Sequence, residues 1–546
     1  MGTWDEPLPL RGITHLVEHL ALHRFDALAH HKNGHVQGSS TEFIVSGNEA
    51  QVVDFLNGVC AALRELPLSR LETEKKILLT EAQTASPTSQ EVLLHARFGA
   101  GGPSRITHDE SAVRWVGESD VVDWAHRWFV AENAVLWISR DELPAGLDLR
   151  LPSGGRMPNP GVEPLPRSRP LSLQGPPRVV MADALVPRST AASMTAELMR
   201  VVLFRELRLE LGISYTAHAS YESMDADTAR LFVVTDASDE HEGAVLGATI
   251  DALAALRAGR VDQRDVDAAR GAYRELVEQW NEPGLIARVA AGRLLFDEPI
   301  VTPESLLAEA DAVTTEQMLE VVRAFWDDAI WSSPVGSLDW IGAHDLSYSS
   351  APVEGRWYEY IGTRDRLVVG DSGVSWVSPE RSLTVRFDDC EMIAAAADGG
   401  RQLIGSDAVT LTIEPTLIRG FGQAELADLD GRVPADRVVP FPARSDENIP
   451  QPPQVEKPRR RRGLGLWALF VGAAIFIVLG LPTLGIALDY AGRIGEIDSD
   501  GELIDVPLVV SISLFPVVFI GLSAWLIVAA IRRMRDRASS RESPSP

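Results

Sequence analysis

Two histidines and a glutamate near the start of the chain have the spacing of a metal site. Residues 15–19 read His-Leu-Val-Glu-His, the pattern H-x-x-E-H. On a helix, residues i and i+4 lie one turn apart on the same face, so His15 and His19 can offer two imidazole nitrogens to one metal ion. Such ligands suit zinc, which lowers the pKa of its bound water toward ~7. Glu18 lies close enough to take a proton from that water.

The motif alone has two other interpretations. It can be an amphipathic helix that carries surface histidines. It can also be part of a loose His-rich metal patch, because His23 continues the i, i+4 spacing and six of the 12 histidines fall in the first 35 residues. A third ligand of the right type would separate these possibilities.

An acidic pair supplies a candidate for that ligand. Residues 71–83 read LETEKKILLTEAQ, and Glu74 and Glu81 lie seven apart, two helical turns, on one face. Ile77 and Leu78 fall between them and would anchor the helix to a core. One glutamate can bind zinc while the other orients a ligand. A solvated acidic face is the other interpretation, but beside the H-x-x-E-H motif the functional one is favoured.

With residues 3–12 ahead of the motif, these segments resemble the pitrilysin/insulinase family of zinc metallopeptidases, in the two-domain form related to mitochondrial processing peptidase. The resemblance implies that His15, His19 and Glu81 bind zinc. It also implies that Glu18 is the general base and that Glu74 is a second acidic residue behind the site.

A second match lies downstream, where residues 208–215 read RLELGISY. This resembles the family's Arg-(six)-Tyr element, which faces the zinc from the other domain. The resemblance implies that Arg208 and Tyr215 grip the substrate backbone and steady the tetrahedral intermediate. A guanidinium and a phenol are suitable donors for an oxyanion. Alone, Arg208 could be a surface helix charge and Tyr215 the first residue of a strand.

The chain of 546 residues predicts several domains and an α+β fold. We expect a metallopeptidase domain with the zinc site at 1–150, a Pro-, Gly- and Ser-rich linker at 151–177, and a second metallopeptidase-like domain at 178–345. Both domains show the order strand, helix, strands, helices. The two therefore look like one duplicated α+β unit, which the resemblance also implies.

The first domain's pattern gives more detail. His31 to Gly34 is a turn signal, and residues 37–46 alternate as a strand. The resemblance implies that this strand pairs with extended substrate. Further elements are expected as helices at 49–65 and 120–129 and a strand at 133–138. Cys60 lies on the apolar face of the 49–65 helix, which indicates a core position.

In the second domain the pattern predicts a strand that starts at Arg178 and a helix over 191–211. We expect strands at 214–220 and 229–235 to follow. Helices are then predicted at about 240–258 and 263–280, with more helix to about 326.

The last 200 residues differ in character. Short alternating runs predict a small antiparallel β module at 353–440, which can be a pleckstrin-homology-like barrel, with a role in binding partners or lipid or as a spacer. A Pro-rich and then basic linker follows at 441–463. The apolar runs 464–488 and 508–531 are long enough for transmembrane helices. Arginines flank both outer ends, which places both termini and the catalytic body in the cytoplasm, on the cell (inner) membrane.

Composition narrows the function classes. A net charge of −26 and a sequence pI near 4.9 argue against nucleic acid as a partner. Cys60 and Cys390 are the two cysteines, so no disulfide framework is indicated, and a reduced, intracellular setting fits. The first residues lack a signal-peptide pattern. Family members usually place one or two strands ahead of the zinc helix, so we expect either a start further upstream or a first sheet without its opening strand.

These expectations combine into a membrane-anchored zinc metalloendopeptidase that cleaves short or unfolded peptides. The resemblance also implies a homodimer, in which the second half of the partner faces the zinc. The alternative is a catalytically inactive scaffold of the same fold that binds partners at the membrane. A transporter is disfavoured, because two spans without internal charge offer no evident path.

Overall fold

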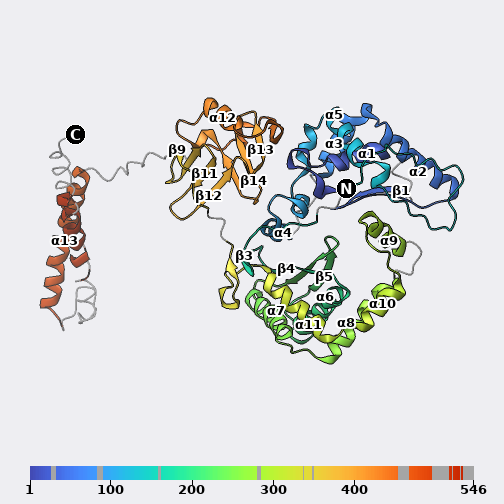
Figure 1. The fold of residues 1–546 in the computed structure, drawn as a ribbon. Coiled ribbons are helices and arrows are strands. Elements are labelled where there is room, and N and C mark those ends of the chain that lie inside the picture. The colour runs from blue at the N-terminus through green and yellow to red at the C-terminus, as the bar shows by residue number, and fades with distance from the viewer. Residues whose placement is uncertain are drawn as a thin grey trace. The chain divides into compact units, whose positions relative to one another are not determined.

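The computed structural model forms two compact units, Met1–Pro453 and Gln454–Pro546 (Figure 1). The residues that the structure describes are 1–25, 32–82, 90–157, 161–279, 285–335, 337–346, 350–452, 466–494, 514, 516–518, 520–528 and 530–532. Within the first unit, the chain builds a helical part, a part around a six-stranded sheet, and a small β module.

Four helices pack together in the first part. They are α1 (Ile13–Leu22), α2 (Glu49–Arg64), α3 (Leu71–Ala82) and α5 (Glu118–Trp128). Apolar residues recur every three or four positions, as in Ile13, Leu16 and Leu20, and these three are fully buried in a common core. Asn48 caps α2 by accepting a hydrogen bond from the backbone N–H of Gln51. The predicted helices at 49–65, 71–83 and 120–129 are confirmed over their described residues.

The strands of the first part differ from those predicted. β1 (Lys32–Val36) and β2 (Thr41–Val45) form an antiparallel hairpin. The turn predicted at 31–34 is therefore wrong from Lys32 onward, and His31 lies outside the described residues. The strand predicted at 37–46 begins only at Thr41, because Gln37 to Ser40 make the hairpin turn, closed by the Gln37 N–H on the Ser40 carbonyl at 2.8 Å.

The strand predicted at 133–138 is wrong. Ala131–Asn133 forms a 3₁₀ turn, and 134–138 pairs with no strand that the structure describes. An extended segment becomes a strand only where a neighbour offers its backbone edge, and the described sheet here contains β1 and β2 alone. Val135, Leu136 and Trp137 consequently stay exposed.

The second part is built on a sheet of strand order β5-β6-β4-β7-β3-β8. Its strands are β3 (Leu171–Gln174), β4 (Val179–Pro187), β5 (Ala217–Ser223), β6 (Thr228–Asp236), β7 (Ile330–Ser333) and β8 (His344–Asp345). Its helices are α6 (Thr190–Leu203), α7 (Glu242–Arg257), α8 (Gln263–Gln279), α9 (Leu285–Leu295), α10 (Pro303–Ala312) and α11 (Thr315–Asp328). The predicted elements are present, but β3 lies inside the predicted linker 151–177. The predicted duplication of one α+β unit is not seen in the sheets. The described residues of the helical part form two strands, whereas this part has six.

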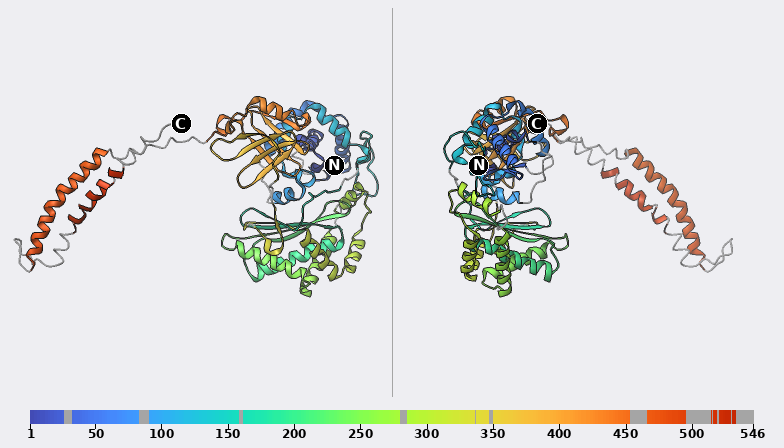
Figure 2. Two further views of the ribbon diagram at one scale, coloured as in Figure 1. Left: turned by 60° about the vertical axis from the view of Figure 1, so that its left-hand side comes forward. Right: turned by 90° about the vertical axis from the view of Figure 1, so that its right-hand side faces the viewer.

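The sheet is covered by helices on one face, as Figure 2 shows. Alternate residues of β4 point to opposite faces. Val180, Ala182 and Val186 join the large core under the helices, whereas Met181 joins a smaller cluster on the other face. That second face receives α4 (Glu91–Phe98), a helix from within the predicted first domain.

A buried charge network fixes α4 to this sheet. Arg97, with a side chain that is 0% exposed, donates to Asp183 of β4 at 2.9 Å and to Asp328 of α11 at 2.6 Å. Arg230 of β6 donates to the other oxygen of Asp183 at 2.7 Å. Burial opposes ionisation of Asp183, but Arg97 and Arg230 hold the pKa of this carboxyl below its usual range. The two parts are thus joined by a desolvated ion network.

The β module has two four-stranded sheets, of order β12-β11-β10-β9 and β15-β14-β13-β16. Its strands are β9 (Gly355–Glu359), β10 (Arg366–Gly370), β11 (Gly373–Val377), β12 (Ser382–Arg386), β13 (Cys390–Ala396), β14 (Arg401–Gly405), β15 (Thr410–Ile413) and β16 (Val438–Phe441). Pairing is antiparallel except between β13 and β16. Helix α12 (Gln423–Asp430) closes the module through Leu426 and Leu429. The predicted small β module is confirmed, and its likeness to pleckstrin-homology barrels stays a prediction.

The β module packs directly on the helical part. Leu8 and Ala100 share a buried cluster with Ile404, and the Ala100 N–H donates to the Ser406 carbonyl at 2.9 Å. Gly99 adopts a φ of 64°, and an added Cβ there would lie 2.0 Å from the Ser406 oxygen, so glycine is required for this contact. Cys390 is buried in the module, whereas Cys60 is half-buried on α2.

The second unit contains α13 (Leu466–Gly492) and helical residues between 514 and 532. The first predicted span, 464–488, falls largely on α13, and the second, 508–531, is described only in part. Among the residues that the structure describes, no helix is both long enough and apolar enough to cross a membrane. The predicted membrane hairpin is therefore not confirmed.

Candidate metal centre

The N-terminus of α1 is held by a buried carboxylate. Glu6, which is 0% exposed, accepts hydrogen bonds from the backbone N–H groups of Gly12 at 2.9 Å and Thr14 at 2.8 Å. These groups have no partner within the helix, and negative charge is favoured at that end. Gly12 takes a φ of 96°, which turns the chain sharply into the helix. The helix that carries the histidines thus starts at a fixed point.

The structure brings His15, Glu18 and His19 together. Potential ligand atoms of these three residues all lie within 4.8 Å of one another. The Nε2 atom of His19 lies 3.8 Å from a carboxylate oxygen of Glu18 and 3.8 Å from one of Glu81. The side chain of Glu18 is 7% exposed, whereas that of Glu81 is 53% exposed. Glu81 therefore reaches the group from α3, at its solvent-facing side.

Each histidine has a carboxylate on its Nδ1 atom. His15 Nδ1 lies 3.0 Å from Glu110, and His19 Nδ1 lies 3.4 Å from Glu74. Arg70 in turn holds Glu74, donating to it from Nη2 at 2.9 Å. A carboxylate on Nδ1 favours the tautomer that keeps its proton there and leaves the Nε2 lone pair free. Both imidazoles are thus prepared to accept a cation through Nε2.

Burial and mutual charge shift the pKa values in this group. Burial, reinforced by the charge of Glu81, raises the pKa of Glu18 to about 7, although His15 opposes the shift. Burial works to lower the pKa of His15, but its hydrogen bond to Glu110 and the nearby carboxylates leave it raised. Burial and the neighbouring His15 lower the pKa of His19. Glu18 is thus poised to exchange a proton near neutral pH.

Strand β1 passes directly beside Glu18. A Cβ added to Gly34 would lie 1.8 Å from the Glu18 carboxylate oxygen Oε1. A side chain at this position would have to displace the Glu18 carboxylate from its place. No strand other than β2 pairs with β1 in the described chain, so one edge of β1 has no strand partner there.

The residues of this group fit a zinc ion. Two imidazole nitrogens and a carboxylate from Glu81 are the donor set of a catalytic site that keeps one position open. Carboxylates behind both histidines supply the outer contacts that such ligands usually have.

Arg208 and Tyr215 also lie together, but apart from the histidines. The Arg208 guanidinium stacks over the Tyr215 ring at 4.7 Å and donates to the Tyr215 carbonyl at 3.2 Å. Arg208 sits in a π-helical segment (Phe204–Glu210) that continues α6, and Asp236 accepts hydrogen bonds from the backbone of Tyr215 and Thr216. The Tyr215 side chain is 76% exposed. Neither residue has a described contact with α1.

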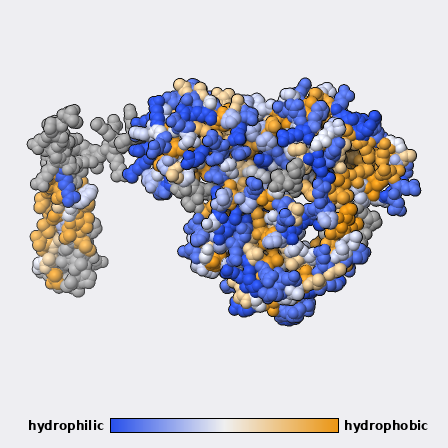
Figure 3. All heavy atoms as spheres, viewed as in Figure 1, coloured by the Kyte–Doolittle hydropathy of each residue, from blue (hydrophilic) through white to orange (hydrophobic). Residues whose placement is uncertain are grey.

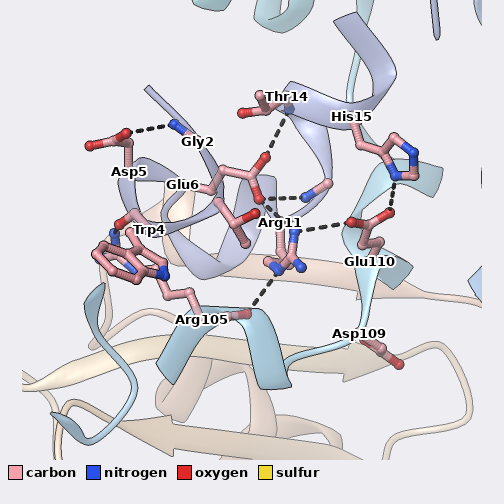
Figure 4. A network of polar contacts seen from close by, with 12 residues as sticks. Gly2, Trp4, Asp5, Glu6, Arg11, Thr14, His15, Arg105, Asp109 and Glu110 are labelled. Atoms are coloured by element: carbon pink, nitrogen blue, oxygen red, sulfur yellow. Dashed lines mark hydrogen bonds and ion pairs between the residues drawn. The ribbon is translucent and has the colours of Figure 1, made fainter. Parts of the chain in front are cut away.

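Sequence reasoning missed Glu6, Arg11, Glu110 and Gly34. Figure 4 shows the first three in one network with His15. Glu110 is 95 positions from His15, so no local spacing relates them. Glu6 lies well ahead of the N-cap residue Gly12, so the local capping pattern does not point to it either. Gly34, by contrast, was assigned to a turn.

No protein-family model matches the sequence, and no curated protein does either. Among solved structures, the periplasmic protease PqqL from Escherichia coli is 12% identical with a TM-score of 0.49, over 69% of this chain and 52% of that one, so the match spans about half of PqqL. A putative M16-like peptidase from Alicyclobacillus acidocaldarius is 14% identical with a TM-score of 0.44, over 59% and 86%. A protease from Helicobacter pylori is 12% identical with a TM-score of 0.50, over 61% and 91%. The last of these likenesses shows a fold shared with that protease over 61% of this chain.

Proposed function

We propose that the chain is a zinc-dependent metalloendopeptidase that cleaves short or unfolded peptides. The observation that carries this proposal is the pair of carboxylates on the two histidine Nδ1 atoms. A surface histidine patch has no reason to orient both rings in this way, whereas metal ligands need it. His15, His19 and Glu81 would hold the zinc.

Bound zinc would polarise the scissile carbonyl and lower the pKa of a water molecule. Glu18 would accept a proton from that water and deliver it to the leaving amine, a task that suits a carboxyl with a pKa near 7. Arg208 and Tyr215 would donate to the oxyanion of the tetrahedral intermediate. Glu74 would orient His19 through Nδ1.

The edge of β1 that no described strand covers is a suitable platform for the substrate. A peptide added there as a strand would run beside Gly34, and thus beside Glu18. Main-chain pairing recognises an extended backbone with limited side-chain preference, which fits unfolded peptides rather than folded proteins.

The test is cleavage of a peptide library by the purified chain, with and without a chelator. We expect chelator-sensitive cleavage that returns on addition of zinc. Glu18→Gln should bind zinc as the wild type does and lose at least ~10³-fold in cleavage rate, because it removes the proton acceptor. His15→Ala serves as the matched variant that loses zinc as well.

A catalytically inactive scaffold of the same fold remains the second candidate. It is favoured by the exposed Tyr215, which has no described contact with the histidine group. Zinc binding without any cleavage by wild-type protein would support the scaffold.

We further propose a homodimer, in which Arg208 and Tyr215 of one chain approach the zinc of the other. The exposure of Tyr215 supports this arrangement. Mixing inactive Glu18→Gln chains with inactive Arg208→Ala chains would restore cleavage in mixed dimers. Sedimentation as a fully active monomer would contradict the proposal.

Attachment to the cell (inner) membrane, with the body in the cytoplasm, is also a proposal. It is supported by the apolar runs with outer arginines, and by apolar side chains on α13 that lie exposed, such as Val478, Leu481 and Leu488 (Figure 3). The Ser523 hydroxyl donates to the Ala473 carbonyl between the two helical segments. The full chain should co-float with lipid vesicles, whereas a chain ending at residue 452 should not.

A further inference from the structure

The partner of His15 comes from a distant part of the chain. Glu110 begins a short 3₁₀ segment (Glu110–Arg114) and places Oε2 3.0 Å from His15 Nδ1. The neighbouring Asp109 instead accepts bonds from Ser111 and has no described contact with His15. Of these two adjacent acidic residues, Glu110 is directed at His15 and Asp109 is not.

Glu110 is itself held in place. Its other oxygen, Oε1, accepts a bond from Arg11 Nη1 at 3.1 Å. Arg11 also donates to Glu6 at 2.7 Å and to the Arg105 carbonyl at 2.9 Å, and its side chain is 7% exposed. The guanidinium thus makes contacts in several directions and cannot rotate away without losing all of them. The Glu110 carboxylate has a fixed direction as a result.

The backbone is shaped to permit this contact. A Cβ on Gly12 would lie 2.6 Å from Val113 and 2.8 Å from the Glu110 Cβ. The absence of a side chain at Gly12 lets the 110–113 segment touch the start of α1. Glu6 fixes that start, so helix, arginine and glutamate form one rigid assembly (Figure 4).

We propose that Glu110 is a positioning residue for the metal. It holds the proton of His15 on Nδ1 and directs Nε2 toward the ion, while Arg11 keeps Glu110 in that direction. The inference rests on the proposed function, because it takes His15 as a zinc ligand. Glu110 mirrors Glu74, which faces His19 at the longer distance of 3.4 Å.

The experiment measures zinc affinity by competition with a chromophoric chelator, on full-length wild type, Glu110→Ala, Glu110→Asp and Glu110→Gln. Glu110→Ala should weaken affinity by ~10–100-fold. Glu110→Asp keeps the charge but withdraws the carboxylate by one methylene, and should lose nearly as much. Glu110→Gln keeps the length but offers a single acceptor oxygen to His15 and Arg11, and should lose less affinity than Glu110→Ala. Asp109→Ala is the matched control and should bind zinc as wild type does.

Each outcome decides a separate point. Wild-type affinity in both Glu110→Ala and Glu110→Asp would overturn the positioning role. Wild-type affinity in Glu110→Asp with a large loss in Glu110→Gln would replace it with a purely electrostatic role. If Glu110→Ala fails to fold, Glu110→Asp decides alone. If the wild type binds no zinc, or His15→Ala binds it equally well, the proposed function itself fails instead.

Discussion

The helical part and the sheet part of the first unit differ in the residues that they bury around their central elements. In the sheet part, helices bury a continuous apolar core against β4, β6 and β7, with Phe325 and Trp331 fully buried. In the helical part, several charged residues near the histidines are buried: Glu6, Arg11, Glu18 and Glu74, taken as whole residues, are each at most 6% exposed. The difference teaches that one part is organised for stability and the other for a site, where polar groups are kept in place at an energetic cost.

The ion network that joins the two parts is charged and lies beside an apolar cluster. Its loss should therefore cause the largest decrease in the free energy of unfolding. Arg97→Met leaves Asp183 and Asp328 without their shared partner in a buried setting. We expect a loss of about 3–5 kcal/mol in the free energy of unfolding, measured by urea denaturation. The control is Arg140→Met, which removes an exposed pair with Glu49 and should cost under about 1 kcal/mol. Equal losses in the two variants would show that burial does not distinguish the pairs.

The burial of the Glu18 carboxylate in the helical part should make the stability of the protein depend on pH. In metal-free protein, folding raises the pKa of Glu18 from 4.5 to about 7, so the folded state binds a proton that the unfolded chain releases. Stability is therefore full below pH 4.5 and is lost as the pH rises toward 7. Glu18→Gln should raise the free energy of unfolding by roughly 2–3 kcal/mol at pH 8 and by about zero at pH 4. A pH-independent gain in Glu18→Gln would contradict the assignment.

The smallest change in stability is expected at the exposed end of the sheet part. Tyr215 is 76% exposed, and its hydroxyl has no described hydrogen bond. Tyr215→Phe should alter the free energy of unfolding by less than about 0.5 kcal/mol. Cleavage should nevertheless fall by ~10–100-fold, if the phenol donates to the oxyanion. Unchanged cleavage would remove Tyr215 from the proposed site and leave the stacked Arg208 as the remaining candidate.

Elements and site residues could be predicted from the sequence where they depend on residues close together in the chain. The i, i+4 spacing of His15 and His19 and the two-turn spacing of Glu74 and Glu81 depend only on helix geometry, and the structure brings all four side chains to the same place. The helices of the sheet part were predictable from apolar periodicity for the same reason.

Contacts between distant segments were not predictable. Glu110 reaches His15 only because the chain folds back on itself, and no spacing within the sequence indicates that contact. At Gly34 the local rule gave the wrong answer, because Asn-Gly is typical of turns. The glycine instead lies in a strand, where a Cβ would displace the Glu18 carboxylate. The strand predicted at 133–138 likewise has the right residues but lacks an adjacent edge in the described sheet.

The contact of Gly99 with Ser406 has a consequence for biosynthesis. The Arg105 carbonyl accepts a hydrogen bond from Arg11, which holds Glu110, and the surface that covers the nearby Ala100 is made about 300 residues later. At ~5–20 residues per second, the ribosome exposes the first helices for roughly 15–60 s before β13 and β14 emerge. During that interval Leu8 and Ala100 lack their apolar partners. The nascent chain therefore presents an incomplete site, and its assembly must be finished after most of the first unit has been synthesised.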